Sequence, residues 1–387
     1  MRRSINFVCY TTMILLGLYL AGYQNVIDSI TGEYSIASSV MGIIIALHFT
    51  GSITAPVIFG EISDRKGSKV IILVALFILI SGLLAASVFQ NIYVLALGIF
   101  LVGSGFSVIE GTLSAVLSNI NPGETVKVIN LSQMYFCIGA VLGPLITLFI
   151  INQFGSWRIL FVLLILLFLL IIFLFSRFDL GKVEGGTVTE KCLTLNENEG
   201  KIHSIALLKS KSFLLLCIAM FLYVGAEEGI AFWTTTFFKH AYNNIVWGSY
   251  ALSGYWTGMI LGRFLAGIFP KKGIMFLFIG TFLSIASIIL ALLVKSEIIG
   301  FISFSLIGLG FSVAWPMIIS ITSDKFSKYK GTAVGIMMSL GAAGGMVIPL
   351  LIGLFDNIDR IKQAFWMFPV FAIIILLAVL KSEKMEV

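Results

Sequence analysis

Long apolar runs alternate with short polar turns along the whole chain. A helix that crosses a bilayer needs about 20 mostly apolar residues. Twelve runs of that kind are predicted, near residues 6–29, 38–60, 69–89, 92–118, 125–152, 157–176, 211–238, 246–269, 273–294, 297–322, 329–353 and 361–380. The pattern predicts an all-α polytopic membrane protein with twelve transmembrane helices.

One polar stretch is long enough to separate two groups of spans. It runs from Arg177 to Lys211 and is rich in Glu and Gly. Because six runs lie on each side of it, we predict an N-terminal six-helix bundle at 1–176, a cytoplasmic linker at 177–210 and a C-terminal six-helix bundle at 211–387.

The two predicted bundles share short glycine-containing motifs, in the same order and at nearly the same spacing. The pairs are Thr50-Gly51 with Thr257-Gly258, Gly103-x-Gly105-Phe106-Ser107 with Gly308-x-Gly310-Phe311-Ser312, and Gly139-x-x-x-x-Pro144 with Gly344-x-x-x-x-Pro349. Internal repeats of this size are typical of transporters that bind substrate near the bilayer midplane, between the repeats. The bundles are therefore predicted to be pseudo-symmetric.

The distribution of Lys and Arg predicts the orientation of the spans. With the N-terminus inside, most basic residues between spans fall on the inner side, and the outer side holds Arg158, Lys239, Lys295, Arg360 and Lys362. We expect a multi-pass protein of the cell (inner) membrane with both termini cytoplasmic. The first run is interpreted as a retained helix, because it is long for a signal peptide and no A-x-A site follows it.

Composition supports a membrane protein and argues against other classes. The 387 residues are 59% hydrophobic and 11% charged, whereas soluble domains average about 25% charged. The net charge of +6 is spread over short loops, which argues against nucleic acid as a partner. The four cysteines lack metal or disulfide spacing, and no catalytic motif is found, so we expect no enzyme activity, no cofactor and no metal. We expect a monomer in the lipid bilayer.

Two carboxylates are candidate proton-coupling groups. Glu110 lies in the fourth run, where a charged side chain costs about 3 kcal/mol to insert. It shares one helix face with the small residues Ser104, Ser107, Gly111, Ser114 and Ser118, which predicts a polar cavity on that side. Asp28 lies four residues after Gln24 in the outer part of the first run. The alternatives are a static Glu110 bonded to a neighbouring helix and an Asp28 at a solvated helix end.

The turn between the second and third runs contains Gly60-x-x-x-Asp64-Arg65-x-Gly67-x-Lys69. This motif resembles the signature of the major facilitator superfamily. The resemblance implies that Asp64, Arg65 and Gly67 belong to a cytoplasmic gate. An aspartate there can accept from backbone N–H groups at a helix end and pair with an arginine.

Arg263 lies near the inner end of the eighth run and is expected to join the gate through an ion pair with Glu61 or Asp324. If Arg263 faced a central cavity instead, an anionic substrate would be indicated.

Four segments resemble the fucose–proton symporter family of sugar transporters. They are Asn25-x-x-Asp28, Glu110 after a Gly-rich stretch, Asn130-Leu-Ser-Gln133 before Gly139-Ala140, and Tyr223-Val-Gly-Ala-Glu227 before Trp233. That family often has Asn-Pro where this chain has Ser114-Ala115, so the resemblance does not imply one particular sugar. It implies proton-coupled sugar transport.

The remaining candidate residues suit a neutral polyol. Amides donate and accept hydrogen bonds without net charge, and aromatic rings stack on the C–H face of a sugar. The candidate substrate ligands are Gln24, Asn25, Asn130, Gln133, Tyr223, Glu227, Trp233 and Trp315. Glu227 is favoured over Glu228 because it shares a helix face with Tyr223. A broken helix is expected beside Trp315, where Pro316 follows. The alternative for the amides is hydrogen bonding between helices.

We therefore predict proton-driven uptake of a neutral monosaccharide by alternating access. The coupling ion could instead be Na⁺, because both ions can use acidic side chains. Proton-driven multidrug efflux is the other alternative, since many Phe and Met residues also suit lipophilic cations. A sugar sensor that does not transport would normally need a longer cytoplasmic domain than this linker offers.

Overall fold

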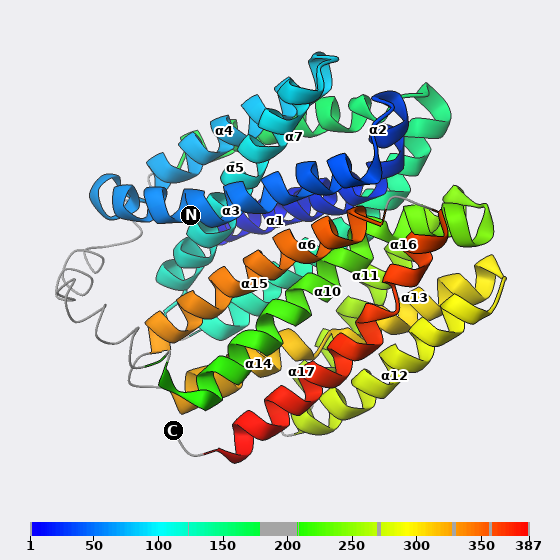
Figure 1. The fold of residues 1–387 in the computed structure, drawn as a ribbon. Helices are drawn as coiled ribbons and strands as arrows, with labels where there is room; N and C mark the ends of the chain where they lie inside the picture. The colour runs from blue at the N-terminus through cyan, green and yellow to red at the C-terminus, as the bar shows by residue number, and fades with distance from the viewer. Residues whose placement is uncertain are drawn as a thin grey trace. The chain divides into compact units, whose positions relative to one another are not determined.

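In its described residues, the computed structural model of this chain consists of helices, and within each half of the chain they are joined by short connections (Figure 1). It describes residues 2–122, 124–178, 207, 209–268, 272–326, 330–355 and 358–385. Within these ranges it describes the backbone but not the side chains at 57, 60–66, 125–126, 267–268, 330–331 and 358–360. Backbone contacts divide the chain into two compact units: Met1–Ile36 with Ile43–Thr194, and Ala37–Gly42 with Leu195–Val387. Nearly all of the predicted linker lies outside the described residues, so its boundaries stay a prediction.

The helices before the linker form the first unit, apart from the first residues of α3. They are α1 (Arg2–Asn25), α2 (Ile27–Glu33), α3 (Ser38–Lys66), α4 (Ser68–Val88), α5 (Ile92–Ile120), α6 (Thr125–Phe154) and α7 (Arg158–Ser176). Within this unit, α1 packs along α6, and α4 packs between α5 and α7.

The second unit repeats this plan. Its helices are α10 (Lys211–Tyr242), α11 (Ile245–Ile268), α12 (Gly273–Leu293), α13 (Glu297–Phe311), α14 (Ala314–Lys325), α15 (Lys330–Gly353), α16 (Ile358–Ala364) and α17 (Met367–Lys384). Here α10 packs along α15, and α13 packs against α11 and α12. The pairing of α10 with α15 repeats that of α1 with α6 (Figure 1).

Polar residues mark several helix ends. The Asn91 side chain accepts from the backbone N–H groups of Tyr93 and Val94 and so caps α5. Ser210 caps α10 in the same way through Phe213. These short polar signals sit between apolar runs, which explains why most span boundaries are readable from the sequence.

Eleven described helices are long and apolar enough to cross a membrane by length and composition. The predicted eighth span, α11, is 24 residues long but is not among them. Its Gly, Ser, Tyr and Trp residues lower its hydropathy, although its length matches that of the other spans.

The sequence repeats mark equivalent helix contacts in the two units. A Cβ on Gly103 in α5 would come within 2.0 Å of the His48 carbonyl oxygen in α3, and one on Gly308 in α13 would come within 2.0 Å of the Tyr255 carbonyl oxygen in α11. Equally close approaches to a carbonyl oxygen would occur at Gly139 beside Ile14 (1.9 Å) and Gly344 beside Phe221 (2.0 Å). The third pair is Gly51 beside Phe100 (2.3 Å) and Gly258 beside Ser305 (2.0 Å). The motifs recur because each pair of helices approaches closely enough to leave room only for glycine.

Two predicted spans are interrupted. The first was predicted as one helix, but it stops at Asn25 and resumes at Ile27, because Val26 (φ −96°, ψ 3°) leaves the helical conformation. The tenth breaks at Ser312 and Val313, between α13 and α14. That break agrees with the prediction from Pro316, which lies in the first turn of α14, where no backbone N–H is needed.

Candidate functional site

Two membrane-embedded carboxylates, one in each unit, have polar partners on a neighbouring helix. In the first unit, the Gln133 Nε2 of α6 donates to the Glu110 Oε1 of α5 at 3.3 Å. Helices α5 and α6 are joined by a short turn, so they run antiparallel and residues equally far from the turn lie side by side. The structure thus brings together a predicted proton-coupling acid and a predicted substrate ligand.

The polar stripe predicted on α5 divides into two parts. Ser104 is buried, packs against Gly51 of α3 and bonds to the Phe100 carbonyl oxygen at 2.9 Å. Further along, Glu110 is half-buried and Gly111 is exposed, with open space where a Cβ would stand. The half nearer the α5–α6 turn therefore offers the accessible polar surface, whereas the other half serves packing.

Asn130 lies on the exposed side of α6. It shares that side with the exposed Met134 and Ile138, whereas Gln133 is half-buried beside Glu110. The two predicted amide ligands of α6 therefore occupy different environments.

In the second unit, Glu227 forms an ion pair with Arg263. The Arg263 Nη2 of α11 donates to the Glu227 Oε1 of α10 at 3.0 Å, and the two side chains are 22% and 10% exposed. The sequence predicts Glu61 or Asp324 as the partner of Arg263, but the structure joins Arg263 to Glu227. The Glu61 side chain lies outside the described residues. Both residues were candidates, but their pairing was not foreseen. Their similar distances from the α10–α11 turn could have indicated it.

Two buried tyrosines surround this ion pair. The Tyr255 Oη donates to the backbone carbonyl oxygen of Glu227 at 3.3 Å. Tyr223, one helical turn before Glu227, is fully buried and close enough to interact with both charged groups, although its hydroxyl makes no hydrogen bond of standard geometry in the described residues. The charges thus sit beside two buried aromatic side chains, and this partial burial strengthens their mutual attraction.

The predicted residues of the first span lie around the α1–α2 break. Gln24 is fully buried and Asn25 is 4% exposed. The Asn25 Nδ2 donates to the Pro144 carbonyl oxygen of α6 at 3.4 Å, while its Oδ1 has no hydrogen-bond partner in the described residues. Asp28, 9% exposed, lies in the first turn of α2. The sequence predicts Gln24 and Asp28 one turn apart on a continuous helix. That prediction is wrong, because the break at Val26 separates them.

The two candidate tryptophans differ in environment. The Trp233 ring is 1% exposed and its Nε1 donates to the Pro349 carbonyl oxygen of α15 at 3.0 Å. Trp315 is partly exposed and lies at the start of α14, directly after the helix break. Trp315 is thus the more accessible ring for stacking on a ligand.

Of the predicted cytoplasmic gate, Gly67 is described in full. It separates α3 from α4 with φ 82° and ψ 152°, a conformation open to glycine and costly for other residues. The side chains of Asp64 and Arg65, at the end of α3, lie outside the described residues. Their gate role stays a prediction.

Comparison with known proteins identifies a family. The model of the Major Facilitator Superfamily matches residues 7–349. The glucose/mannose transporter GlcP of Bacillus subtilis (strain 168) is 23% identical over 385 residues, which cover 94% of each chain.

Solved structures show the same fold. A D-xylose-proton symporter matches with a TM-score of 0.78 at 14% identity, over 99% of this chain and 98% of that one. A bacterial homolog of the human lysosomal transporter Spinster matches with a TM-score of 0.76 at 13% identity, over 99% and 97%. At such identities the likeness establishes the fold, which has twelve helices in two six-helix bundles.

Proposed function

Because this chain belongs to the major facilitator superfamily, and is therefore a membrane transporter and not an enzyme, we propose that it takes up a neutral monosaccharide with protons by alternating access. Two kinds of support favour a sugar. One relative is a glucose/mannose transporter and one structural neighbour is a D-xylose-proton symporter. The sequence also resembles the fucose–proton symporter family at Asp28, Glu110, Gln133 and Tyr223.

The Glu227–Arg263 pair favours a neutral substrate. An arginine in a membrane site would attract an anionic substrate, but here its charge is opposed by a carboxylate at 3.0 Å. The pair can still donate and accept hydrogen bonds at its exposed edges, as a sugar hydroxyl requires. Within the second unit, the pair and the partly exposed Trp315 offer contacts that need no net charge on the ligand.

The single observation that carries proton coupling is the contact between Glu110 and Gln133. A neutral amide donates to this carboxylate. An amide can donate through its NH₂ group or accept through its oxygen, so Gln133 can stay bonded to Glu110 whether or not the acid carries a proton. Glu227, in contrast, is joined in an ion pair to a permanent cation, which can only donate to it. We propose that Glu110 and Asp28 both take part in proton coupling, and that Glu110 holds the proton that moves with the sugar.

We further propose that the protein is a monomer in the cell membrane, with both termini and the linker in the cytoplasm. The excess of Lys and Arg in the segments on that side supports this orientation.

Uptake into proteoliposomes tests the function. The purified protein is reconstituted, and a panel of radiolabelled hexoses and pentoses is offered with an imposed pH gradient, with an imposed Na⁺ gradient, or with neither. We expect accumulation of at least one neutral sugar only under the pH gradient. Accumulation under the Na⁺ gradient alone would show that the coupling ion is Na⁺ and not the proton.

A matched set of substrates separates sugar uptake from efflux. Charged sugar acids test whether the substrate must be neutral. Lipophilic cationic dyes test whether the protein is an efflux pump. If no neutral sugar accumulates while dyes are expelled from loaded vesicles, the protein is an efflux pump and the proposal is wrong.

A further inference from the structure

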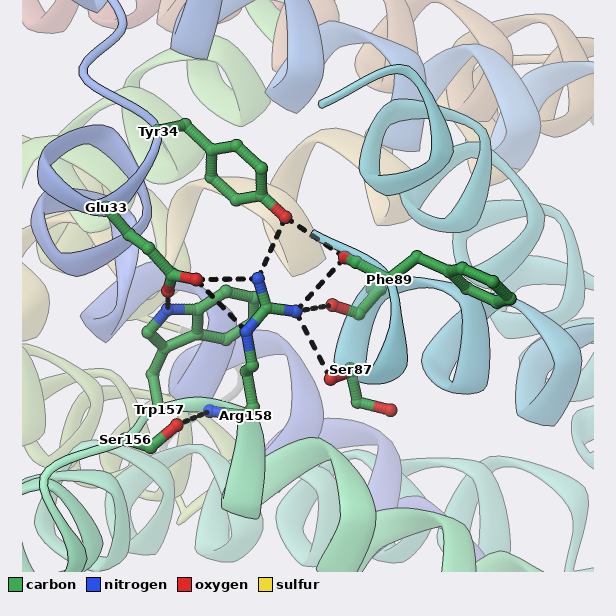
Figure 2. A network of polar contacts seen from close by, with 8 residues as sticks. Glu33, Tyr34, Ser87, Phe89, Ser156, Trp157 and Arg158 are labelled. Carbon is green, nitrogen blue, oxygen red and sulfur yellow. Dashed lines mark hydrogen bonds and ion pairs between the residues drawn. The ribbon is translucent and has the colours of Figure 1, made fainter. Parts of the chain in front are cut away.

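A cluster around Arg158 joins three helices of the first unit (Figure 2). The guanidinium donates from Nε and Nη2 to the Glu33 Oε1 at 3.2 and 2.7 Å, and from Nη2 to the Tyr34 hydroxyl at 2.9 Å. Its Nη1 donates to the carbonyl oxygens of Ala86, Ser87 and Phe89 at 2.8, 3.2 and 3.3 Å. All three nitrogens of the guanidinium are therefore used.

The partners come from structurally distinct places. Glu33 and Tyr34 lie at the end of α2, the three carbonyl groups lie at the end of α4, and Arg158 opens α7. Carbonyl groups at a helix C-terminus lack intrahelical donors and carry partial negative charge, so a cation there is favourable. Arg158 satisfies them and holds Glu33 at the same time.

Trp157 completes the cluster. Its Nε1 donates to the other Glu33 oxygen, Oε2, at 2.5 Å. The Arg158 guanidinium carbon lies 4.7 Å from the centroid of the Trp157 ring, within cation–π range. Glu33 is thus held through both oxygens, by two consecutive residues at the start of α7.

The helix that this cluster holds is short and interrupted from α1. Helix α2 has seven residues, and a helix of that length has little stability of its own. Ile27 and Ile30 are buried and fix its apolar side, whereas its far end is held by the contacts of Glu33 and Tyr34. Asp28 lies in its first turn, between the break and the Arg158 cluster.

The second unit has part of the cluster but no break. The Tyr242 hydroxyl donates to the Ala291 carbonyl oxygen at the end of α12, at 2.6 Å, as Tyr34 donates to Phe89 at the end of α4. There α10 continues unbroken to Tyr242, and the Trp-Arg pair at the start of α7 is replaced by Trp366 and Met367. At this place the described residues of the second unit have neither the helix break nor the arginine, because α10 is continuous and residue 367 is a methionine.

We propose that Arg158, acting through Glu33, is the positioning residue that orients α2 and so sets Asp28 for proton coupling. This inference rests on the proposed function and adds to it a residue that touches neither proton nor sugar. A lysine would replace the planar guanidinium by a point charge, which cannot hold Glu33, Tyr34 and three carbonyl groups together.

The test compares Arg158→Met, the side chain found at the corresponding place in the second unit, with Arg158→Lys and with Tyr242→Phe as matched control. Each reconstituted variant is measured three ways: amide hydrogen exchange of residues 27–34, hexose exchange without a gradient, and hexose accumulation driven by a pH gradient. Hydrogen exchange reports local release of α2 without any need for sugar.

For Arg158→Met we expect exchange at 27–34 to rise about tenfold, with other helices unchanged. Accumulation should fall about fivefold while gradient-free hexose exchange stays within about twofold of wild type, because only positioning for coupling is lost. Arg158→Lys should be intermediate, and Tyr242→Phe should match wild type in all three measurements.

Unchanged hydrogen exchange at 27–34, or a parallel loss of both transport activities, would overturn the inference while leaving the proposed function intact. If the wild-type protein accumulates no hexose under a pH gradient, the proposed function fails and the inference fails with it. Hydrogen exchange would then show separately whether Arg158 holds α2.

Discussion

At the scale of single residues, the embedded glutamates Glu110 and Glu227 differ in the chemical group that donates a hydrogen bond to them. Glu110 accepts from an amide, and Glu227 accepts from an arginine. An amide can donate to or accept from the acid and so bonds to both of its protonation states, whereas an arginine can only donate. The two sites therefore suit different tasks, proton exchange at Glu110 and fixed hydrogen bonding at Glu227.

Glu110→Gln should abolish accumulation of sugar under a pH gradient while leaving expression and gradient-free exchange near wild type. The amide preserves size and can still bond to Gln133, but it cannot bind or release a proton. Radiolabelled uptake with and without a gradient measures the effect. Gln133→Glu is the complementary variant, because it keeps Glu110 and places a second carboxyl group beside it. Accumulation at the wild-type level in Glu110→Gln would remove Glu110 from the coupling mechanism.

Glu227→Gln and Arg263→Met should each destabilise the protein by on the order of 3 kcal/mol, because each leaves one charge of the pair without its opposite. The double variant should lie closer to wild type than either single variant. Thermal unfolding of the purified protein in detergent measures all three. Additive losses in the double variant would show that the two residues do not depend on each other.

The sequence indicated the chemical types at these sites but not all of the pairings. Glu110 and Gln133 were both predicted, and their contact follows from the short α5–α6 turn. Arg263 was assigned to a gate because it lies near the end of its run, yet its long side chain reaches Glu227 near the middle of α10. The position of a side-chain charge depends on helix packing, which periodicity alone does not specify.

At the scale of helices, close packing at glycine explains the repeats. Gly103→Val should prevent folding, because even a Cβ there would meet the His48 backbone at 2.0 Å. Gly111→Ala, eight residues later in the same helix α5, should be tolerated because nothing lies within 4 Å of its Cβ position. Yield of monodisperse protein after membrane extraction tests both. Equal yields would contradict the packing described for α3 and α5.

Gly67→Ala should lower stability by about 1–3 kcal/mol, because φ 82° with ψ 152° is a conformation that side chains oppose. Gly335→Ala, in the second turn of α15 with open space at its Cβ position, is the matched control and should be neutral or stabilising. Thermal unfolding in detergent distinguishes the two. A neutral Gly67→Ala would mean that the α3–α4 turn readily adopts another conformation.

Most helices were predictable because their apolar runs end at clear polar signals such as Asn91 and Ser210. The break between α13 and α14 was also predictable, since Pro316 cannot continue the hydrogen bonding of a helix interior. The break at Val26 was not, because a β-branched apolar residue gives no breaking signal. Tertiary contacts at the end of α2, including those of Arg158, accompany that break and are invisible in the hydropathy pattern.

At the scale of the whole molecule, the scaffold repeats and the chemistry does not. The glycine contacts are equivalent in the two units, but the places of Glu110 and Gln133 are taken by Trp315 and Met338 in the second. The Arg158 cluster likewise belongs to the first unit. This division is the reason why we propose proton coupling for the first unit, while the second holds the Glu227–Arg263 ion pair.

The family and its fold of two bundles could be predicted from the sequence, because span number, repeats and the loop motif at Gly67 all agree. The substrate could not be deduced in the same way. It depends on the relative placement of a few polar side chains, and replacing one of them changes specificity without changing the hydrophobic pattern.

The central claim is that sugar and proton move together, in the same direction, through a site containing Glu110. The most direct measurement is the pH inside proteoliposomes, followed with an enclosed dye while hexose is added outside without any imposed gradient. Hexose entry should acidify the interior of wild-type vesicles. Glu110→Gln vesicles preloaded with unlabelled hexose should exchange it for labelled hexose without acidification. Hexose entry into wild-type vesicles with no acidification, or with alkalinisation, would contradict the account.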